Sequence, residues 1–188
     1  MSTSSLFRLS ALAAFISAVC MFVGHLLSLL PDPQPGLIIA FFSPVAGLWA
    51  ITGIYLWQRE KAGVFGGIGY IVSFFGLALI VGLVFASTFI FPRLGENVVE
   101  GLMTGSTGMI FMVSAIIYLV GIILFGISII VVGVFYWIPA LLFMIGFIPA
   151  TLFTIFPPIV GTIGHVVAAV GIFWLGLSLW SFSAKRAG

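Results

Sequence analysis

The sequence predicts an all-α membrane protein, a six-transmembrane-helix bundle built from three tandem helical hairpins. Three observations lead to this prediction. The 188 residues are 63% hydrophobic and 5% charged, with a mean hydropathy of +1.40, and so few charges could not cover the surface of a soluble domain. Six long apolar runs follow one another along the chain. One short motif closes every second run.

The apolar runs have the length that a membrane helix needs. A hydrocarbon core of about 30 Å requires about 20 apolar residues. We place the six spans near residues 9–30, 36–57, 64–90, 108–130, 134–156 and 159–181. The breaks coincide with turn residues, among them the proline-rich run 31–36, the charged run 58–61 and Pro157-Pro158. We therefore expect residues 1–188 to form a single transmembrane domain.

An internal repeat supports the three hairpins. A Gly-x-x-Leu-aromatic step occurs as Gly53-Ile-Tyr-Leu-Trp57, as Gly121-Ile-Ile-Leu-Phe125 and as Gly176-Leu-Ser-Leu-Trp180. The triplet Gly63-Val64-Phe65, which follows the first step, recurs as Gly133-Val134-Phe135 after the second. This recurrence places the break between the fourth and fifth spans near Gly133, where no charge marks it. The even-numbered helices are then all expected to end on one side of the membrane.

The basic residues predict the orientation, because Lys and Arg near helix ends favour the cytoplasmic side. With the N-terminus inside, only Arg93 is outside. The five cytoplasmic residues are Arg8, Arg59, Lys61, Lys185 and Arg186. We therefore expect a multi-pass protein of the cell inner membrane with cytoplasmic N- and C-termini. Its expected partners are the lipid bilayer and a membrane-protein partner or further copies of the chain, and nucleic acid is not among them.

His25 and His165 are the only ionisable side chains that we place deep in the predicted spans. Such groups are functional candidates, because they are costly to bury in a membrane. Their contexts match, since each follows a glycine, Gly24 in the first span and Gly164 in the last. At about 1.5 Å of rise per residue, their predicted depths differ by only a few Å. The two imidazoles are therefore expected at one level of the outer half.

Several kinds of site are consistent with two histidines at one depth. They could be the axial ligands of a b-type haem, and a metal role is expected of His25 and His165 only in that case. They could instead bind a lipid, a quinone or a transition metal, or serve as structural residues that donate hydrogen bonds across a helix interface. For a ligand pocket we add Ser28 and Thr162 as candidates, because both fall in the same outer half. No other cofactor is expected.

The remaining chemistry of the sequence argues against an enzyme. No Asp or Glu lies inside a predicted span, and no nucleophile accompanies an acid or base at a recognisable spacing, so no catalytic residue is assigned. We expect a non-enzymatic accessory or interaction subunit, or a binder of a small lipophilic ligand with an outer-half pocket between the first and last spans. The alternatives are a haem-binding electron-transfer protein that uses His25 and His165, and a small transporter.

The second half of the chain resembles a group of small bacterial polytopic membrane proteins known only as domains of unknown function. The resemblance runs from Tyr118-Leu-Val-Gly121 to Ser181, and its clearest elements are Gly133-Val134-Phe135 and Gly176-Leu-Ser-Leu-Trp180. It implies a polytopic helical fold and a bacterial origin for this uncharacterised group. It implies no activity.

Overall fold

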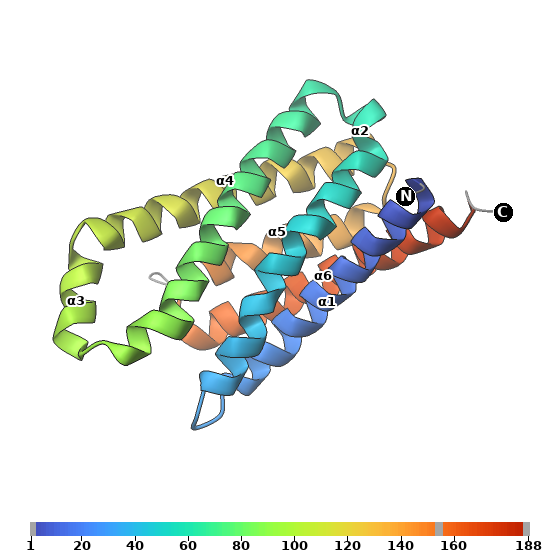
Figure 1. Ribbon diagram of the computed structural model, residues 1–188. Coiled ribbons are helices and arrows are strands. Elements are labelled where there is room, and N and C mark those ends of the chain that lie inside the picture. The colour runs from blue at the N-terminus through green and yellow to red at the C-terminus, as the bar shows by residue number, and fades with distance from the viewer. Residues whose placement is uncertain (1–2, 153–155, 186–188) are drawn as a thin grey trace.

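The computed structural model describes residues 3–152 and 156–185, and this part of the chain contains helices and short connections but no strand (Figure 1). The predicted all-α class is therefore confirmed. The helices are α1 (Thr3–Leu27), α2 (Gln34–Phe85), α3 (Glu96–Thr104), α4 (Ser106–Val132), α5 (Trp137–Thr151) and α6 (Pro158–Lys185). A π-helical turn (Ala86–Ile90) and a 3₁₀ turn (Phe91–Arg93) extend α2 towards α3.

Helix α2 consists of two arms that meet at Gly63. The backbone of Gly63 has φ 57° and ψ −160°, outside the helical region, and Figure 1 shows that α2 folds back on itself. Tyr55 and Tyr70, on opposite arms, stack with ring centroids 4.3 Å apart, and the Thr52 and Tyr70 hydroxyls lie 3.1 Å apart. The arms correspond to the second and third predicted spans. The predicted break at 58–61 is wrong, since these residues are helical and the chain turns at Gly63.

The junction between α4 and α5 uses the repeat-equivalent glycine. Gly133 caps α4 in the left-handed conformation, with φ 67° and ψ 17°, and its N–H donates to the Ile129 carbonyl at 3.3 Å. Gly63 and Gly133 are the two residues with positive φ in the described chain. The repeat in the sequence therefore marks two turns in the structure. Helix α5, with 15 residues, is shorter than the predicted span 134–156, because Tyr136 before it is extended and Leu152 after it is no longer helical.

Glycines bring the helices together in three pairs. The pairs are α1 with the first arm of α2, the second arm of α2 with α4, and α5 with α6. In each pair a glycine lies where a Cβ would collide with the backbone of the partner helix. The collisions would be 2.5 Å from Ala40 N for Gly24, 2.5 Å from Tyr118 Cα for Gly76 and 2.5 Å from Gly146 O for Gly164. Small residues at helix contacts are typical of membrane proteins.

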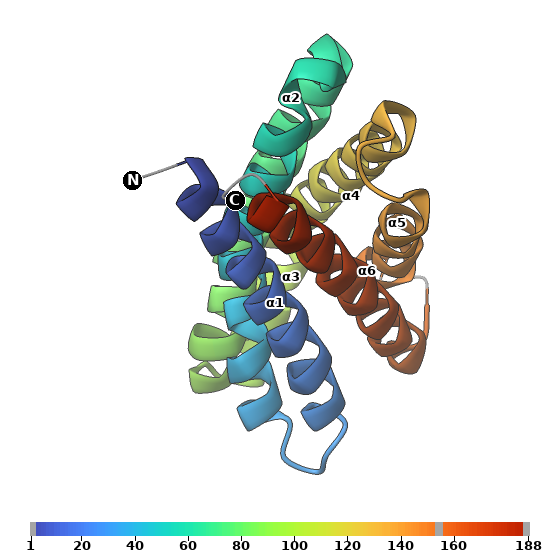
Figure 2. The ribbon, with the colours of Figure 1, turned by 90° about the vertical axis from the view of Figure 1, so that its right-hand side faces the viewer.

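The three pairs close into a ring. Helix α1 packs against both α2 and α6, α2 against α4, α4 against α5, and α5 against α6. Figure 2 shows α1 and α2 on one side of the molecule and α5 and α6 on the other. Every helical segment of the ring thus turns one face towards a common centre.

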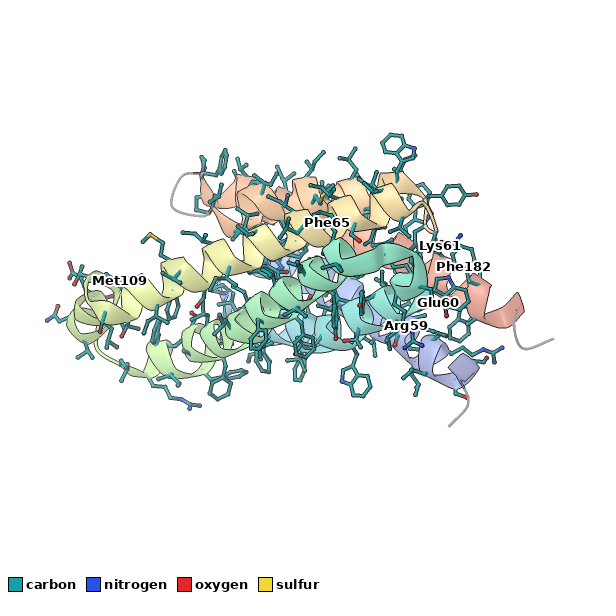
Figure 3. The ribbon with its side chains drawn as sticks, turned by 90° about the horizontal axis from the view of Figure 1, so that it is seen from above. Arg59, Glu60, Lys61, Phe65, Met109 and Phe182 are labelled. Carbon is teal, nitrogen blue, oxygen red and sulfur yellow. The ribbon has the colours of Figure 1, made fainter. Side chains whose placement is uncertain are left out.

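The two ends of the bundle differ in character. Both termini lie at one end, which we call the terminal end (Figures 1 and 2). Arg59, Glu60 and Lys61 lie at that end, while Met109 lies at the opposite end beside α3, the α3 end (Figure 3). Four helical stretches are long and apolar enough to cross a membrane, judged by length and composition: Ser4–Leu27, Gln34–Arg93, Ser106–Val132 and Pro158–Ser183. Of the basic residues, Arg186 lies outside the described residues.

Candidate functional site

The structure brings the two histidines into direct contact. His25 on α1 and His165 on α6 stack with ring centroids 3.6 Å apart and an angle of 16° between the ring planes. The same two helices also approach each other closely about three turns away, where a Cβ at Gly176 would lie 2.9 Å from the Ala14 side chain. The two rings therefore form one unit, which we call the histidine pair.

Each histidine is tied to its own helix through Nδ1. His25 Nδ1 lies 2.8 Å from the carbonyl oxygen of Met21, and His165 Nδ1 lies 2.9 Å from that of Gly161. A carbonyl oxygen can only accept a hydrogen bond, so each Nδ1 carries the proton that it donates. In a neutral ring the other nitrogen, Nε2, then has a free lone pair. No described residue donates a hydrogen bond to either Nε2 atom.

The histidine pair forms part of the wall of a cavity of about 480 Å³ in the centre of the ring. The cavity is lined by residues of every long helix, from Phe91 and Met103 near the α3 end to Ile54 and Phe125 beyond the middle of the bundle. It is thus more central than the pocket predicted between the first and last spans. Its volume falls in the range of small-molecule sites, about 300–1,000 Å³.

The lining of the cavity is mostly apolar, with a few hydroxyl groups. Among the described residues no Asp, Glu, Lys or Arg lines it. Ser17 and Ser43 face each other with their oxygens 3.3 Å apart. The Ser73 hydroxyl is buried without a hydrogen-bond partner. The other polar lining residues are Ser87, Thr88, Tyr118 and Thr151. Such a lining suits an uncharged lipophilic molecule with a small polar group.

Aromatic contacts fix the histidine pair against the rest of the wall. Phe147 on α5 makes a T-shaped contact with His165, with ring centroids 6.2 Å apart and an interplanar angle of 79°. Phe147 also meets Tyr118 on α4, with centroids 5.4 Å apart at 79°. Edge-to-face contacts of this kind are favourable beyond the area that they bury. Four helices therefore hold the two imidazoles in place.

The histidine pair does not have the geometry of haem ligation. Two axial histidines point their nitrogens at the iron from opposite faces of the porphyrin, and with metal–nitrogen bonds of about 2 Å the two nitrogens alone are about 4 Å apart. Here the rings lie face to face at 3.6 Å, which leaves no space for a macrocycle between them. Within the described residues there is also no group of three or more His, Cys, Asp or Glu side chains that could hold a metal ion.

The two hydroxyl residues predicted beside the histidines do not line the cavity. The Ser28 hydroxyl donates to the His25 carbonyl at 2.8 Å, and the Thr162 hydroxyl donates to the Pro158 carbonyl at 3.3 Å. Both side chains are therefore engaged by their own helices, and neither is among the lining residues. Sequence reasoning missed Ser73 and Tyr118 as wall residues. No pattern in the sequence separates them from the other residues of these apolar helices.

A second group of buried polar atoms lies outside the cavity. Gln58 is 1% exposed, and neither its amide oxygen nor its amide nitrogen has a hydrogen-bond partner. The hydroxyl of Ser128 on α4 is likewise buried and unpartnered. It faces Gly66, where a Cβ would lie 2.6 Å from the Ser128 oxygen. Neither Gln58 nor Ser128 is among the residues that line the cavity.

The cavity and the histidine pair are the features on which a functional conclusion can rest. Comparisons of the chain with protein-family models, with curated proteins and with solved structures find no match. The functional conclusion therefore comes from the geometry of this chain alone.

Proposed function

We propose that the chain crosses the cell inner membrane six times, as three hairpins with both termini in the cytoplasm. The stretch Gln34–Arg93 has 60 residues and folds back at Gly63, so it is long enough for two crossings. The 15 residues of α5 rise about 22 Å, less than the hydrocarbon core of about 30 Å, so α5 is the crossing that needs its flanking residues. The crossings of α1, α4 and α6 are long enough by themselves.

The distribution of basic residues supports this orientation. Arg59 and Lys61 lie at the terminal end (Figure 3), Arg8 is near the start of α1, and Arg93 ends the 3₁₀ turn before α3. A membrane-impermeant maleimide applied to intact cells tests it, with Cys20 replaced by Ala in both variants. We expect labelling of Glu100→Cys, on the outer side, and none of Lys61→Cys. Labelling of Lys61→Cys alone would reverse the orientation.

We propose further that the protein binds a small lipophilic ligand in the central cavity and carries out no chemistry on it. The observation that carries this proposal is the apolar cavity of about 480 Å³ with the histidine pair in its wall. An empty apolar cavity forfeits the contacts of its lining atoms, so a ligand of suitable size gains contacts on all sides. The absence of charged lining residues among those described fits an uncharged occupant.

Native mass spectrometry of the gently extracted protein tests this function. We expect the native chain of 20.1 kDa, incubated with a lipid extract of the host membrane, to carry a small bound molecule. Ala115 lines the cavity, so Ala115→Phe should fill part of it and abolish the added mass. Ile116, the next residue, is 50% exposed on the outer face of α4, and Ile116→Phe is the matched control that should retain it. A native chain without added mass, or an equal adduct in both variants, would refute the proposal.

A further inference from the structure

The histidine pair points to the chemical class of the ligand. We propose that the cavity selects an uncharged lipophile with a hydroxyl head, an alcohol or a phenol, which donates its hydrogen to Nε2 of His25 or His165. This inference rests on the proposed ligand-binding function and adds to it the polar group that is recognised.

The first argument is the direction of the hydrogen bonds. Both Nδ1 atoms donate to carbonyl oxygens of their own helices, at 2.8 Å in His25 and 2.9 Å in His165. Each neutral ring therefore presents Nε2 as a hydrogen-bond acceptor and has no second N–H to offer. A ligand with only acceptor oxygens, such as an ether, an ester or a quinone carbonyl, finds no donor at this position. A hydroxyl group supplies the missing donor.

The second argument is the absence of compensating charge. No Asp, Glu, Lys or Arg is among the described residues that line the cavity, and an ion without a partner is costly in an apolar site. Charging both imidazoles to hold an anion would place two positive rings 3.6 Å apart, where like charges repel strongly. A neutral head avoids both costs. A hydroxyl is neutral and supplies the hydrogen that Nε2 of the histidine pair can accept.

The third argument is size and shape. At about 30 Å³ for each water-sized group, a volume of about 480 Å³ holds on the order of 16 non-hydrogen atoms. Phe125, Phe143 and Phe147 contribute aromatic faces to a wall that is otherwise mainly aliphatic. A bicyclic aromatic molecule with one hydroxyl group fits these requirements, which makes 1-naphthol a suitable probe.

The test compares 1-naphthol with 1-methoxynaphthalene, which has nearly the same shape but no hydroxyl hydrogen. Binding of each to the full-length protein in lipid nanodiscs is measured by equilibrium dialysis against empty nanodiscs. We expect the native protein to bind 1-naphthol about five- to tenfold more tightly, the contribution of one net hydrogen bond. In the double variant H25F/H165F, which keeps two stacked rings but no ring nitrogen, the two probes should bind equally.

The possible results separate this inference from the proposed function. Equal binding of both probes to the native protein would overturn the hydroxyl selectivity and leave the ligand site intact. A preference that survives in H25F/H165F would also overturn it, because the acceptor would then be another group. Saturable binding of neither probe would count against the cavity as a ligand site altogether. Ser28→Ala is the control variant, because Ser28 does not line the cavity, and it should keep the native preference.

Discussion

The helix pairs and the centre of the ring contain similar small residues but differ in packing. Within a pair, Gly76 lets its helix approach Tyr118 so closely that no Cβ fits between them. In the centre, Ala40, Gly47, Ala50 and Ala115 border a cavity of about 480 Å³. Two helices can close a gap between them by moving together. In the ring, α1, the two arms of α2, α4, α5 and α6 hold one another apart. The same small residues therefore make tight contacts in pairs and leave space in the middle.

Under the proposed function, the helix pairs provide the stability and the central cavity holds the ligand. Membrane helices gain little from hydrophobicity when they associate, so close backbone packing has to hold them together. An unfilled interior costs stability in proportion to its volume. A ligand in the cavity would recover part of that cost.

The largest effect is expected where a side chain is added inside a pair. Gly76→Ala places a Cβ 2.5 Å from Tyr118 Cα, and because backbone cannot move aside easily, we expect a loss of about 1–3 kcal/mol. Gly82 lies on the same arm with nothing within 4 Å of its Cβ position, so Gly82→Ala should be neutral or slightly stabilising. Unfolding by SDS titration, followed by circular dichroism, measures both. Equal losses in the two variants would show that the contact at Gly76 does not hold the pair.

Substitutions at the two glycine turns that connect the helix pairs should differ in their cost to stability. Gly63 has φ 57° and ψ −160°, a region that is essentially restricted to glycine, so Gly63→Ala should cost about 1–3 kcal/mol. Gly133 is left-handed, a conformation that Asn tolerates, so Gly133→Asn should cost much less. A Cβ added at either glycine would have no atom within 4 Å. The loss of stability therefore comes from the backbone conformation alone. The same titration checks them, and a larger loss for Gly133→Asn would contradict this account of the turns.

A buried polar residue offers a substitution that should stabilise the protein. Both polar atoms of the Gln58 amide are buried without a partner, and an unsatisfied buried group costs about 1–3 kcal/mol. Gln58→Met keeps the length of the side chain and removes the polar atoms, so we expect a gain of roughly 1 kcal/mol in the SDS titration. A clear loss instead would mean that bound water or another group satisfies the amide.

The smallest effect is expected at the contact between the two arms of α2. Tyr70→Phe removes the hydroxyl that lies 3.1 Å from the Thr52 hydroxyl but keeps the ring that stacks on Tyr55. One neutral hydrogen bond is worth about 0.5–1.5 kcal/mol, so a loss at the lower end is expected. Tyr70→Ala, which also removes the stack, should lose considerably more when measured in parallel. Equal losses would mean that the stacked rings contribute nothing.

The sequence was most informative about the positions of the long helical segments. Apolar runs and turn residues located every long helix, and the repeat identified as equivalent the two positions, Gly63 and Gly133, that share a positive φ in the structure. It was less accurate for the boundaries of α5 and for the residues 58–61. At residues 58–61 the chain stays helical as far as Gly63, the residue that adopts positive φ, although the charged run itself suggested a turn.

The site was predictable only in its histidines. His25 and His165 stand out because ionisable groups are rare in apolar helices, and their glycine neighbours suggested a common depth. The other wall residues could not be identified, because helices that are apolar on all sides show no periodicity that separates the inward from the outward face. The hydroxyls of Ser28 and Thr162 had the right depth, but they bond to their own helices. Depth follows from sequence position, whereas direction depends on how the helices pack.

The most direct test of the central claim is photolabelling with a small uncharged lipophile that carries a diazirine, followed by mapping of the modified peptides. The account expects labels on cavity-lining residues such as Met21, Leu77 and Ile122, and their suppression by an excess of the same molecule without the diazirine. Labels confined to outward-facing residues such as Ile16 and Ile71, unaffected by the competitor, would show that the cavity does not bind lipophiles and would contradict the proposed function.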